Sequence, residues 1–312
     1  MKIGLDIMGG DFAPEAAVLG AIECYQVLSP DQKLVLIGDQ EVALKIIADN
    51  NFDAGCFEYV HTTEVIGMAE HPTKAIAQKP QSSIGIGFKL LKEGKIDSFA
   101  SAGNTGAMMV GAMFSVKAIP GVIRPAIAGI VPKLIGGCGI ILDVGANADC
   151  KPDMLVQFGI LGSLMAESLY HIHLPKVGLI NIGEEKEKGN LLCQATYPLM
   201  AENKQFNFVG NVEGRDLFTD QADVFVCDGF TGNVVLKLAE NFYEITLQKG
   251  MRNEFFDRFN YEQYGGSPIL GVNAPVIIGH GISNPEAIKS MILLSRNTVE
   301  SGLIEKIKQA FL

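Results

Sequence analysis

The sequence predicts an α/β protein in which a mostly parallel sheet lies between two layers of helices, a three-layer α/β/α sandwich. Short apolar runs alternate with amphipathic stretches along the whole chain. Hydrophobic residues make up 48% of the 312 residues and charged residues 19%, which is ample material for a large core. Glycine occurs 35 times, which indicates many tight turns. Strands and helices that alternate so often are typical of a parallel sheet covered on both faces.

The expected elements follow one another in a regular order. Strands are expected at residues 2–8, 33–37, 57–61, 98–101, 126–131, 139–142, 176–181, 206–209, 222–227 and 276–278. Helices are expected at residues 14–28, 40–48, 82–93, 104–116, 153–170, 190–200, 232–247, 285–301 and 303–311. Internal repeats and long polar linkers are absent from the sequence. We therefore expect a single α/β domain over residues 1–312, with a small lobe at 53–95 as a variant of it.

Charge and cysteine usage restrict the function. A formal net charge of −10 disfavours nucleic acid as a partner, because phosphate backbones demand basic faces. The six cysteines form no CxxC pair and no histidine stands at ligand spacing to them, so we expect reduced thiols and no metal. The most apolar stretch, residues 107–131, is interrupted by Lys117 and Arg124. No membrane span and no signal peptide are expected, which favours a cytoplasmic protein.

Loops rich in Gly, Asn and Asp follow the expected strands. Ligands of open parallel sheets bind beyond the carboxyl ends of the strands, so these loops should hold the site. The most informative are SAGNTG at 101–106, LDVGANADCKP at 142–152, NIGEEKEKGN at 181–190, CDGFTGN at 227–233 and GHGISN at 279–284.

The loop SAGNTG has the chemistry of a phosphate cradle. Ser101 ends a strand, Gly103 lets the backbone approach a ligand, and Asn104 and Thr105 add side-chain dipoles. The free N–H groups of the helix that begins there favour an anion. An ordinary capped turn is the alternative, since Asn and Thr are good caps.

Two further loops carry candidate catalytic groups. In CDGFTGN, Asp228 is suited to orient a neighbouring donor or a cation. Gly232 opens a helix, and Asn233 offers an amide N–H to a developing oxyanion. In NIGEEKEKGN, a lysine that points inward would offset phosphate charge. The alternatives are a turn-forming carboxylate at Asp228 and a solvated charge run.

His280 in GHGISN is either an acid or base or a histidine bonded to the backbone. No GxSxG elbow and no recognisable Cys or Ser nucleophile motif is present, which favours direct attack by a bound substrate. The GxGxxG dinucleotide fingerprint is also missing, which weakens the alternative of a dehydrogenase.

With these loops assembled, the sequence resembles the bacterial phosphate acyltransferase family of phospholipid synthesis (PlsX). The resemblance runs nearly end to end and rests on a series of long motifs in the same order. They are MKIGLDIMGGD, SAGNTGAMM, LDVGANADCKP, VGLINIGEE, KGN, NVEGRD, CDGFTGNVVLK, YGGSPILGVN and HGISN.

The resemblance implies a reaction in which an acyl group passes from acyl carrier protein to inorganic phosphate, with no cofactor. It also implies a phosphotransacetylase-like or isocitrate-dehydrogenase-like fold, a homodimer and a downstream glycerol-3-phosphate acyltransferase. Lys188 and Asn233 fall on active-site positions of the family. Asp228, Asn104 and Thr105 are expected in the surrounding pocket, and the phosphate is expected on the helix starts after Gly103 and Gly232.

Two features depart from the family pattern. Phe12 stands where the first motif usually has a histidine, and the segment 238–263 is shorter than in many relatives. Phe255, Phe256 and Phe259 in that segment form either a peripheral membrane contact or a helix that packs its aromatic side chains on its own dimer. Two functional alternatives stay open at this point. One is a transferase that uses coenzyme A, and the other is a non-catalytic organiser of lipid synthesis.

Overall fold

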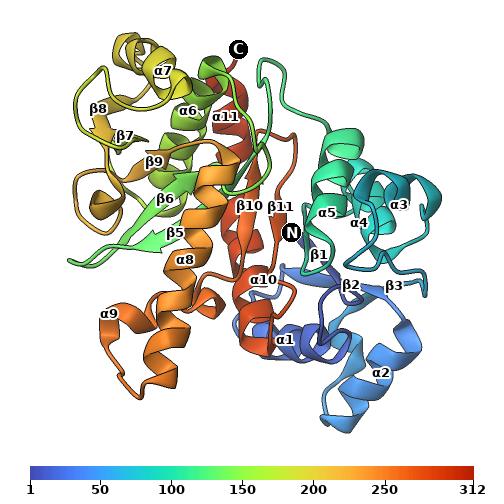
Figure 1. Cartoon of the computed structure of the whole chain (residues 1–312). Coiled ribbons are helices and arrows are strands. Elements are labelled where there is room, and N and C mark those ends of the chain that lie inside the picture. Colours follow the sequence, from blue (N-terminus) through green and yellow to red (C-terminus); the bar gives the residue numbers. More distant parts are fainter. The chain divides into compact units, whose positions relative to one another are not determined.

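The computed structural model describes the backbone of residues 1–312 and every side chain except that of Tyr261 (Figure 1). The chain forms two compact units. Unit 1 consists of Met1–Ala118 and Tyr261–Glu300, and unit 2 consists of Ile119–Asn260 and Ser301–Leu312. Each unit has the predicted α/β architecture. The expectation of one continuous domain stays a prediction.

Unit 1 is built around a mostly parallel sheet. Its strands are β1 (Lys2–Asp6), β2 (Lys33–Gly38), β3 (Glu58–His61), β4 (Ser98–Ser101), β10 (Ser267–Leu270) and β11 (Val276–Ile278). Its α-helices are α1 (Glu15–Tyr25), α2 (Gln40–Asp49), α3 (Pro72–Gln78), α4 (Ser83–Lys92), α5 (Thr105–Gly111) and α10 (Pro285–Glu300). The strand order is β3-β2-β1-β4-β11-β10, and β10 alone among these strands runs antiparallel to its neighbour.

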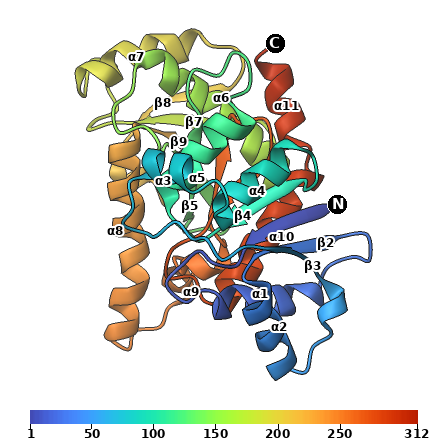
Figure 2. The ribbon, with the colours of Figure 1, turned by 90° about the vertical axis from the view of Figure 1, so that its right-hand side faces the viewer.

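Helices cover both faces of the unit 1 sheet. Because successive side chains of a strand point to opposite faces, Ile3 and Leu5 share one core with residues of α1 and α10. On the other face Gly87 of α4 lies so close to the Phe99 ring that a Cβ there would overlap it. Figure 2 shows α4 and α5 on one side of the strands and α1 and α10 on the other.

Unit 2 repeats this plan. Its strands are β5 (Ala126–Pro132), β6 (Cys138–Leu142), β7 (Lys176–Ile180), β8 (Asn207–Val212) and β9 (Val224–Val226). Its α-helices are α6 (Pro152–Leu169), α7 (Leu191–Glu202), α8 (Gly229–Gln248), α9 (Glu254–Asp257) and α11 (Leu303–Ala310). The strand order is β5-β6-β9-β7-β8, with β5 and β6 antiparallel and the other neighbours parallel.

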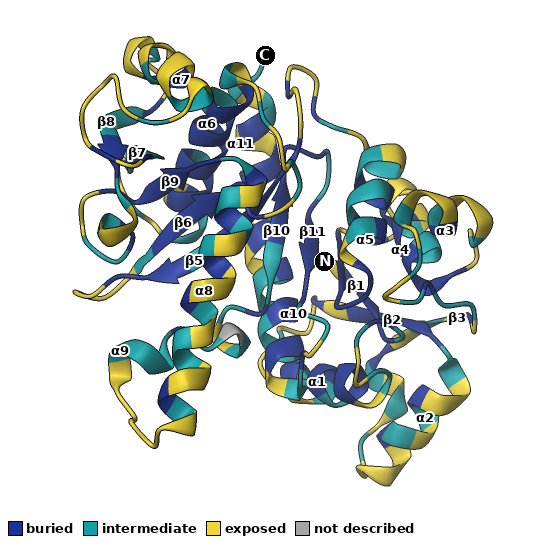
Figure 3. Ribbon diagram, in the orientation of Figure 1, coloured by how far each residue is buried: buried dark blue, intermediate teal, exposed yellow. Residues whose placement is uncertain are grey.

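Glycines let the helices of unit 2 approach its sheet. A Cβ at Gly162 of α6 would overlap Val224 of β9, and one at Gly129 of β5 would lie 2.9 Å from Leu236 of α8. The strands are accordingly the buried layer, and the helices expose one side (Figure 3). Among the described residues, no helix combines the length and the apolar character that a membrane crossing requires.

The structure corrects several expected elements. The helices α3 and α9 and the strand β10 were not expected, and the helix expected at 104–116 is α-helical only over Thr105–Gly111 and continues as a π-helix over Ala112–Val116. The helix α8 begins at Gly229 rather than at residue 232. Capping by Asp228 explains this earlier start, because its carboxylate accepts a hydrogen bond from the Thr231 N–H.

The phenylalanines of the shortened segment pack against one another. Phe255 and Phe259 have ring centroids 5.2 Å apart, and Phe218 lies 5.3 Å from Phe259. Phe259 is buried, whereas Phe255 and Phe256 are partly exposed. The Arg258 guanidinium donates to the carbonyls of Lys133 and Gly137. Much of this aromatic surface therefore contacts unit 2 itself, and both the membrane contact and the dimer contact stay predictions.

Candidate active site

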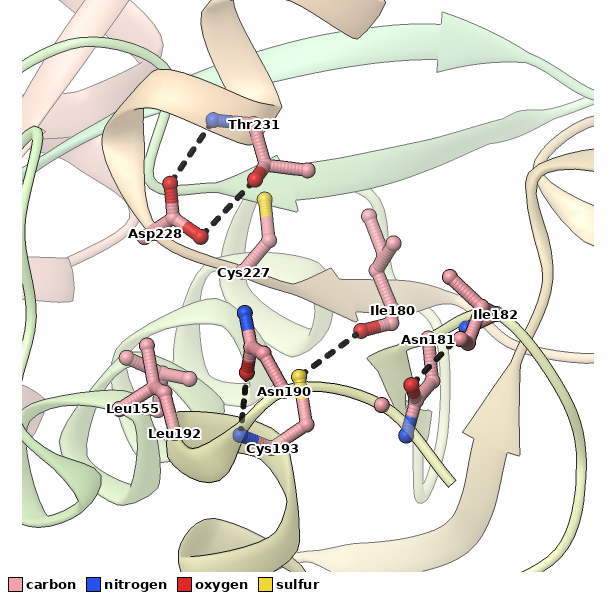
Figure 4. A pocket seen from close by; sticks show the side chains of 11 residues that line it. Leu155, Ile180, Asn181, Ile182, Asn190, Leu192, Cys193, Cys227, Asp228 and Thr231 are labelled. Atoms are coloured by element: carbon pink, nitrogen blue, oxygen red, sulfur yellow. Dashed lines mark hydrogen bonds between the residues drawn. The ribbon is translucent and has the colours of Figure 1, made fainter.

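A pocket of about 380 Å³ lies in unit 2, where strands β7 and β9 end and helices α7 and α8 begin (Figure 4). Leu155, Ile180 and Leu192 contribute an apolar wall. Asn190, Asp228 and Thr231 add polar groups at the helix starts. The pocket therefore occupies the position expected of a ligand site, beyond the carboxyl ends of parallel strands.

Asp228 connects β9 to α8 at the edge of this pocket. One carboxylate oxygen accepts a hydrogen bond of 2.8 Å from the Thr231 N–H, and the other accepts one of 2.9 Å from the Thr231 hydroxyl. Aspartate is a preferred N-cap residue, which explains this local geometry. The side chain acts as a helix cap and also presents a negative charge to the pocket.

The loop between β7 and α7 is held in place by side-chain amides. Asn181 is buried, and its amide donates to the Lys188 carbonyl across 3.1 Å. The amide of Asn211 donates to the Glu185 carbonyl across 2.8 Å. Gln194 donates to the carbonyls of Glu187 and Gly189, each across 3.0 Å. These bonds fix the main chain of a loop whose charged side chains face solvent.

Lys188 stands on this fixed loop, directly before the pocket residues Gly189 and Asn190. Its side chain is exposed, and its ammonium forms no ion pair among the described side chains. Gly189 has φ of +91°, and a Cβ there would overlap the Asn181 amide. The motif KGN therefore requires glycine at its second position, because glycine adopts this φ without strain and leaves room for the Asn181 amide. The ammonium of the lysine beside it is not neutralised by any described side chain.

The thiols of the pocket are poor nucleophiles. Burial and then the Asp228 charge raise the pKa of Cys193. Burial also raises the pKa of Cys227 well above its usual range. Cys150, which stands near the same charges, has its pKa raised to about 12, mainly by burial and next by Asp143. Because the thiolate is the reactive form, these cysteines are chemically quiet at neutral pH.

Gly232 and Asn233 lie in the first turns of α8, against the turn that follows β6. A Cβ at Gly232 would overlap the Asp143 carbonyl oxygen, so only glycine allows the helix to approach this closely. The half-buried Asn233 donates from Nδ2 to the Val144 carbonyl across 3.0 Å. This bond orients the amide and identifies its nitrogen as the atom that faces Val144.

Asp143 and Asn147 in this turn form a hydrogen-bonded pair that the sequence did not predict. The Asp143 carboxylate is fully buried and accepts two hydrogen bonds from Asn147, of 2.6 Å from its N–H and 2.9 Å from its side-chain amide. The available signal was the motif LDVGANADCKP, in which an acid directly follows an apolar strand. Its partners could not be read from the sequence.

In unit 1, Ser101 lies at the end of β4 and is fully buried. Its hydroxyl donates to the Asp6 carboxylate across 2.6 Å and accepts from the Gly103 N–H across 2.9 Å. Burial raises the pKa of Asp6, and the bonds from Ser101 and Ser83 oppose that rise. The side chain of Ser101 thus orients the turn, and the Gly103 N–H is already bonded.

Asn104 is buried, and its side chain forms its hydrogen bonds with residues of unit 1. Its Oδ1 accepts from the Ala107 N–H across 3.0 Å, as a helix cap does. Its Nδ2 lies 3.1 Å from each of the carbonyls of Gly67, Met68 and Glu70 and so holds the loop in front of α3. Thr105, the first residue of α5, is exposed.

His280 follows β11 in a turn of unit 1. Its carbonyl accepts from the Ser283 N–H across 3.0 Å and from the Ser283 hydroxyl across 2.6 Å. Its ring is half-buried. The structure shows a structured turn at this position, and a role in proton transfer stays a prediction.

The predicted site residues divide between the units. Ser101, Gly103, Asn104, Thr105 and His280 belong to unit 1. Lys188, Asp228, Gly232 and Asn233 belong to unit 2, and Asp228 lines the pocket there. The expectation that all of these loops share one phosphate stays a prediction. Among the described side chains, no group of three or more His, Cys, Asp or Glu residues is arranged to hold a metal ion.

The fold is shared with two solved phosphotransacetylases. A phosphotransacetylase from Streptococcus pyogenes superposes with a TM-score of 0.68 at 17% identity, covering 98% of this chain and 94% of that one. The EutD phosphotransacetylase from Staphylococcus aureus superposes with a TM-score of 0.64 at 16% identity, covering 96% and 94% of the two chains. At this identity the likeness concerns the fold alone, and it confirms the predicted α/β class.

The sequence relatives are more specific. The family model described as "Fatty acid synthesis protein" matches residues 1–249. The phosphate acyltransferase of Dictyoglomus turgidum is 43% identical, covering 98% of this chain and 96% of its own length. The phosphate acyltransferase of Desulforamulus reducens is 44% identical, covering 99% and 97%. The chain belongs to this family, as its motifs predicted, and it is an acyltransferase.

Proposed function

We propose that this protein transfers a fatty acyl group from acyl carrier protein to inorganic phosphate, giving acyl phosphate and free carrier protein. The product would supply phosphatidic acid synthesis through a downstream glycerol-3-phosphate acyltransferase. The name and high coverage of the phosphate acyltransferase relatives support inorganic phosphate as the acceptor of the acyl group. The description of the family as a fatty acid synthesis protein supports a carrier-bound acyl donor.

The reaction needs no external activation. A phosphate oxygen attacks the thioester carbonyl carbon and forms a C–O bond while negative charge builds on the carbonyl oxygen. The C–S bond then breaks, its electron pair leaves with sulfur, and the thiolate takes a proton from water. A thiol pKa of about 8.5 makes this leaving group a good one. Both the thioester and the acyl phosphate are activated acyl groups, so neither ATP nor a cofactor is required.

The observation that carries the proposal is the position of Lys188. It is an exposed ammonium on a loop held by Asn181, immediately before pocket residues. A cation in this place is suited to hold phosphate at the pocket mouth. Asn233 keeps one Nδ2–H beyond its bond to Val144, and such a donor suits the developing oxyanion.

The state of the thiols favours direct attack over a covalent acyl-enzyme. Burial raises the pKa of both pocket cysteines, Cys193 and Cys227. A nucleophilic cysteine requires the opposite shift. The acyl group therefore passes to phosphate in one transfer.

Two surfaces support partner proposals. Phe230, Val234 and Leu238 form an exposed apolar stripe on α8, with exposures of 67%, 53% and 59%. Their spacing of four residues places them on one face, which suits a homodimer contact. We also propose a peripheral membrane contact through the partly exposed Phe255 and Phe256. The proposed location is the cytoplasm.

The test is to incubate the purified protein with palmitoyl-acyl carrier protein and labelled phosphate and to measure labelled acyl phosphate. Palmitoyl-coenzyme A serves as the competing donor in a parallel reaction. Product formation from the carrier-bound chain with a higher kcat/KM supports the proposal. A preference for coenzyme A would favour the phosphotransacetylase-like alternative, and no phosphate-dependent loss of either thioester would favour a non-catalytic organiser.

A further inference from the structure

The turn that follows β6 contains a buried carboxylate with an unusual set of partners. Both oxygens of Asp143 are used. One accepts from the N–H groups of Ile127 and Ala146 at 3.0 and 3.2 Å, and the other accepts from the N–H and side-chain amide of Asn147. No ion pair to Asp143 is found among the described side chains. A carboxylate buried without a cation is costly, so its presence calls for a reason beyond stability.

The same turn contacts three residues at the start of α8. The Asn147 carbonyl accepts from the Gly229 N–H across 2.7 Å, and the Val144 carbonyl accepts from the Asn233 amide across 3.0 Å. The Asp143 carbonyl packs against Gly232, where no Cβ fits. The first turns of α8 therefore rest on this turn at three points.

Asp143 controls both ends of this support. By bonding Asn147, it fixes the position of the Asn147 carbonyl, which accepts from the Gly229 N–H. Through Ile127 it also fixes the main-chain position of Val144. The Ile127 N–H donates to Asp143, and the Ile127 carbonyl accepts from the Val144 N–H across 3.0 Å. A single carboxylate thus connects β5, the turn and the start of α8.

We propose that Asp143 and Asn147 are positioning residues, which hold Asn233 and the N-terminus of α8 in the geometry that acyl transfer requires. This inference rests on the proposed function, because it assigns Asn233 as a donor to the thioester oxygen. The carboxylate does not contact the substrate. It acts through Asn147 and Val144.

The consequence for catalysis follows from geometry. The Val144 carbonyl accepts one Nδ2–H of Asn233 and thereby fixes the direction of the other Nδ2–H. A displacement of the donor by about 1 Å lowers the rate by up to a hundredfold, because the oxyanion forms only in the transition state. Substrate binding in the ground state depends less on this donor. Loss of Asp143 should therefore reduce kcat more than it changes KM.

The main experiment uses Asp143→Asn, which keeps the shape of the side chain but turns one acceptor into a donor opposite existing N–H groups. We expect kcat for acyl phosphate formation to fall about 10- to 100-fold while KM for both substrates stays within about threefold. Asn147→Ala, which keeps the main-chain bonds and removes the amide, should show the same split with a smaller fall.

The matched control is Asp223→Asn. Asp223 is also a buried aspartate of unit 2, but it lies just before β9 and accepts from the Lys176 N–H rather than supporting α8. This variant should lose stability and keep its kcat. The proposal would be overturned if Asp143→Asn and Asp223→Asn lost the same stability and the same fraction of kcat. It would also be overturned if Asp143→Asn folded and kept a kcat near that of wild type.

A second readout does not depend on activity. Amide hydrogen exchange in Asp143→Asn should speed up at Gly229 and Thr231 and remain unchanged near Gln248, at the other end of α8. Unchanged exchange at the start of α8 would overturn the positioning role. If wild type makes no acyl phosphate, the proposed function fails, whereas faster exchange in the variant would still show that Asp143 holds the helix start. Should Asp143→Asn not fold, Asn147→Ala answers both questions.

Discussion

The side-chain amide of Asn181 donates a hydrogen bond of 3.1 Å to the main-chain carbonyl of Lys188. Asn181 is buried and Lys188 is exposed, so an interior group sets the position of a surface lysine. The charge run that separates them in the sequence is therefore not a loose solvated loop. It is a structured segment in which Lys188 directly precedes the pocket residues Gly189 and Asn190.

The first prediction concerns that cation. Lys188→Ala should lower kcat/KM for acyl phosphate formation on the order of 100-fold, because phosphate loses the charge that offsets its own. The KM for phosphate should rise with it. Lys186→Ala is the matched control, since Lys186 is an exposed lysine of the same loop that does not adjoin the pocket residues. Near-normal rates in Lys188→Ala would falsify the assignment.

Gly189→Ala tests the backbone that carries Lys188. A side chain there is strained at φ of +91° and overlaps the Asn181 amide, so we expect a loss of about 1–3 kcal/mol in the free energy of unfolding. The loop should shift and activity should fall with it. Gly214→Ala provides the comparison, because nothing lies within 4 Å of a Cβ at Gly214. Urea unfolding measures both, and equal stability of the two variants would contradict the expectation.

Thiol reactivity should be low in the folded protein. The pKa of Cys150 is raised from 9.0 to about 12, and below its pKa the thiolate fraction falls tenfold for each unit of increase. A thiolate of higher pKa is intrinsically more nucleophilic, which offsets part of this loss. At pH 8 alkylation of Cys150 by iodoacetamide should thus be about 50-fold slower than that of an ordinary thiol. The rate should rise tenfold per pH unit. Alkylation of the urea-unfolded chain is the control, and equal rates in both states would refute the prediction.

Lys133 should contribute stability that is lost at alkaline pH. Its side chain is 5% exposed and pairs with Asp220 at 3.0 Å and with the nearly buried Asp223. Burial lowers the pKa of Lys133, but the bonds to the two aspartates outweigh it and the pKa ends above 10.5. A raised pKa in the folded state means that the contribution is complete below 10.5 and disappears as pH rises through the higher value.

Lys133→Met should therefore cost about 3–5 kcal/mol at pH 7, because Asp223 keeps a buried charge without its partner. The difference from wild type should shrink above pH 10.5. Unfolding by urea at both pH values measures this change. A difference that stays constant with pH would mean that the ion pair is not its source.

The stripe on α8 predicts the oligomeric state. The double variant Val234→Asp, Leu238→Asp places two charges on the exposed apolar face and should reduce the mass in light scattering from that of two chains to that of one. Leu174→Asp is the control, because Leu174 is equally exposed, at 62%, but lies outside α8. A double variant that remains a dimer would exclude this face as the contact.

Much of the architecture could be predicted from local pattern. Apolar runs at period two and helical spacing predicted most of the strands and helices, because burial of alternate faces leaves a direct trace in the sequence. Glycine-rich turns after the strands were also visible in the sequence, whereas the helix α8 begins at Gly229, three residues before its predicted start. The strand β10 was not, since its proline and its antiparallel pairing with β11 depend on a neighbour in space. The short helices α3 and α9 give too few turns for a periodic signal.

The sequence alone determined the α/β class, the family and the loops in which the chemistry should lie, because motifs and periodicity are local properties of the chain. Only the tertiary structure decided what each polar side chain does. Asn104 turned out to hold a loop, Asp228 to cap a helix, and Asp143 to connect β5 with α8. Asp228 bonds Thr231 only three residues along the chain, but Asn233 and Val144 are 89 residues apart, and Ser101 and Asp6 are 95 apart. Such contacts arise only when the packed sheet brings the strand ends together.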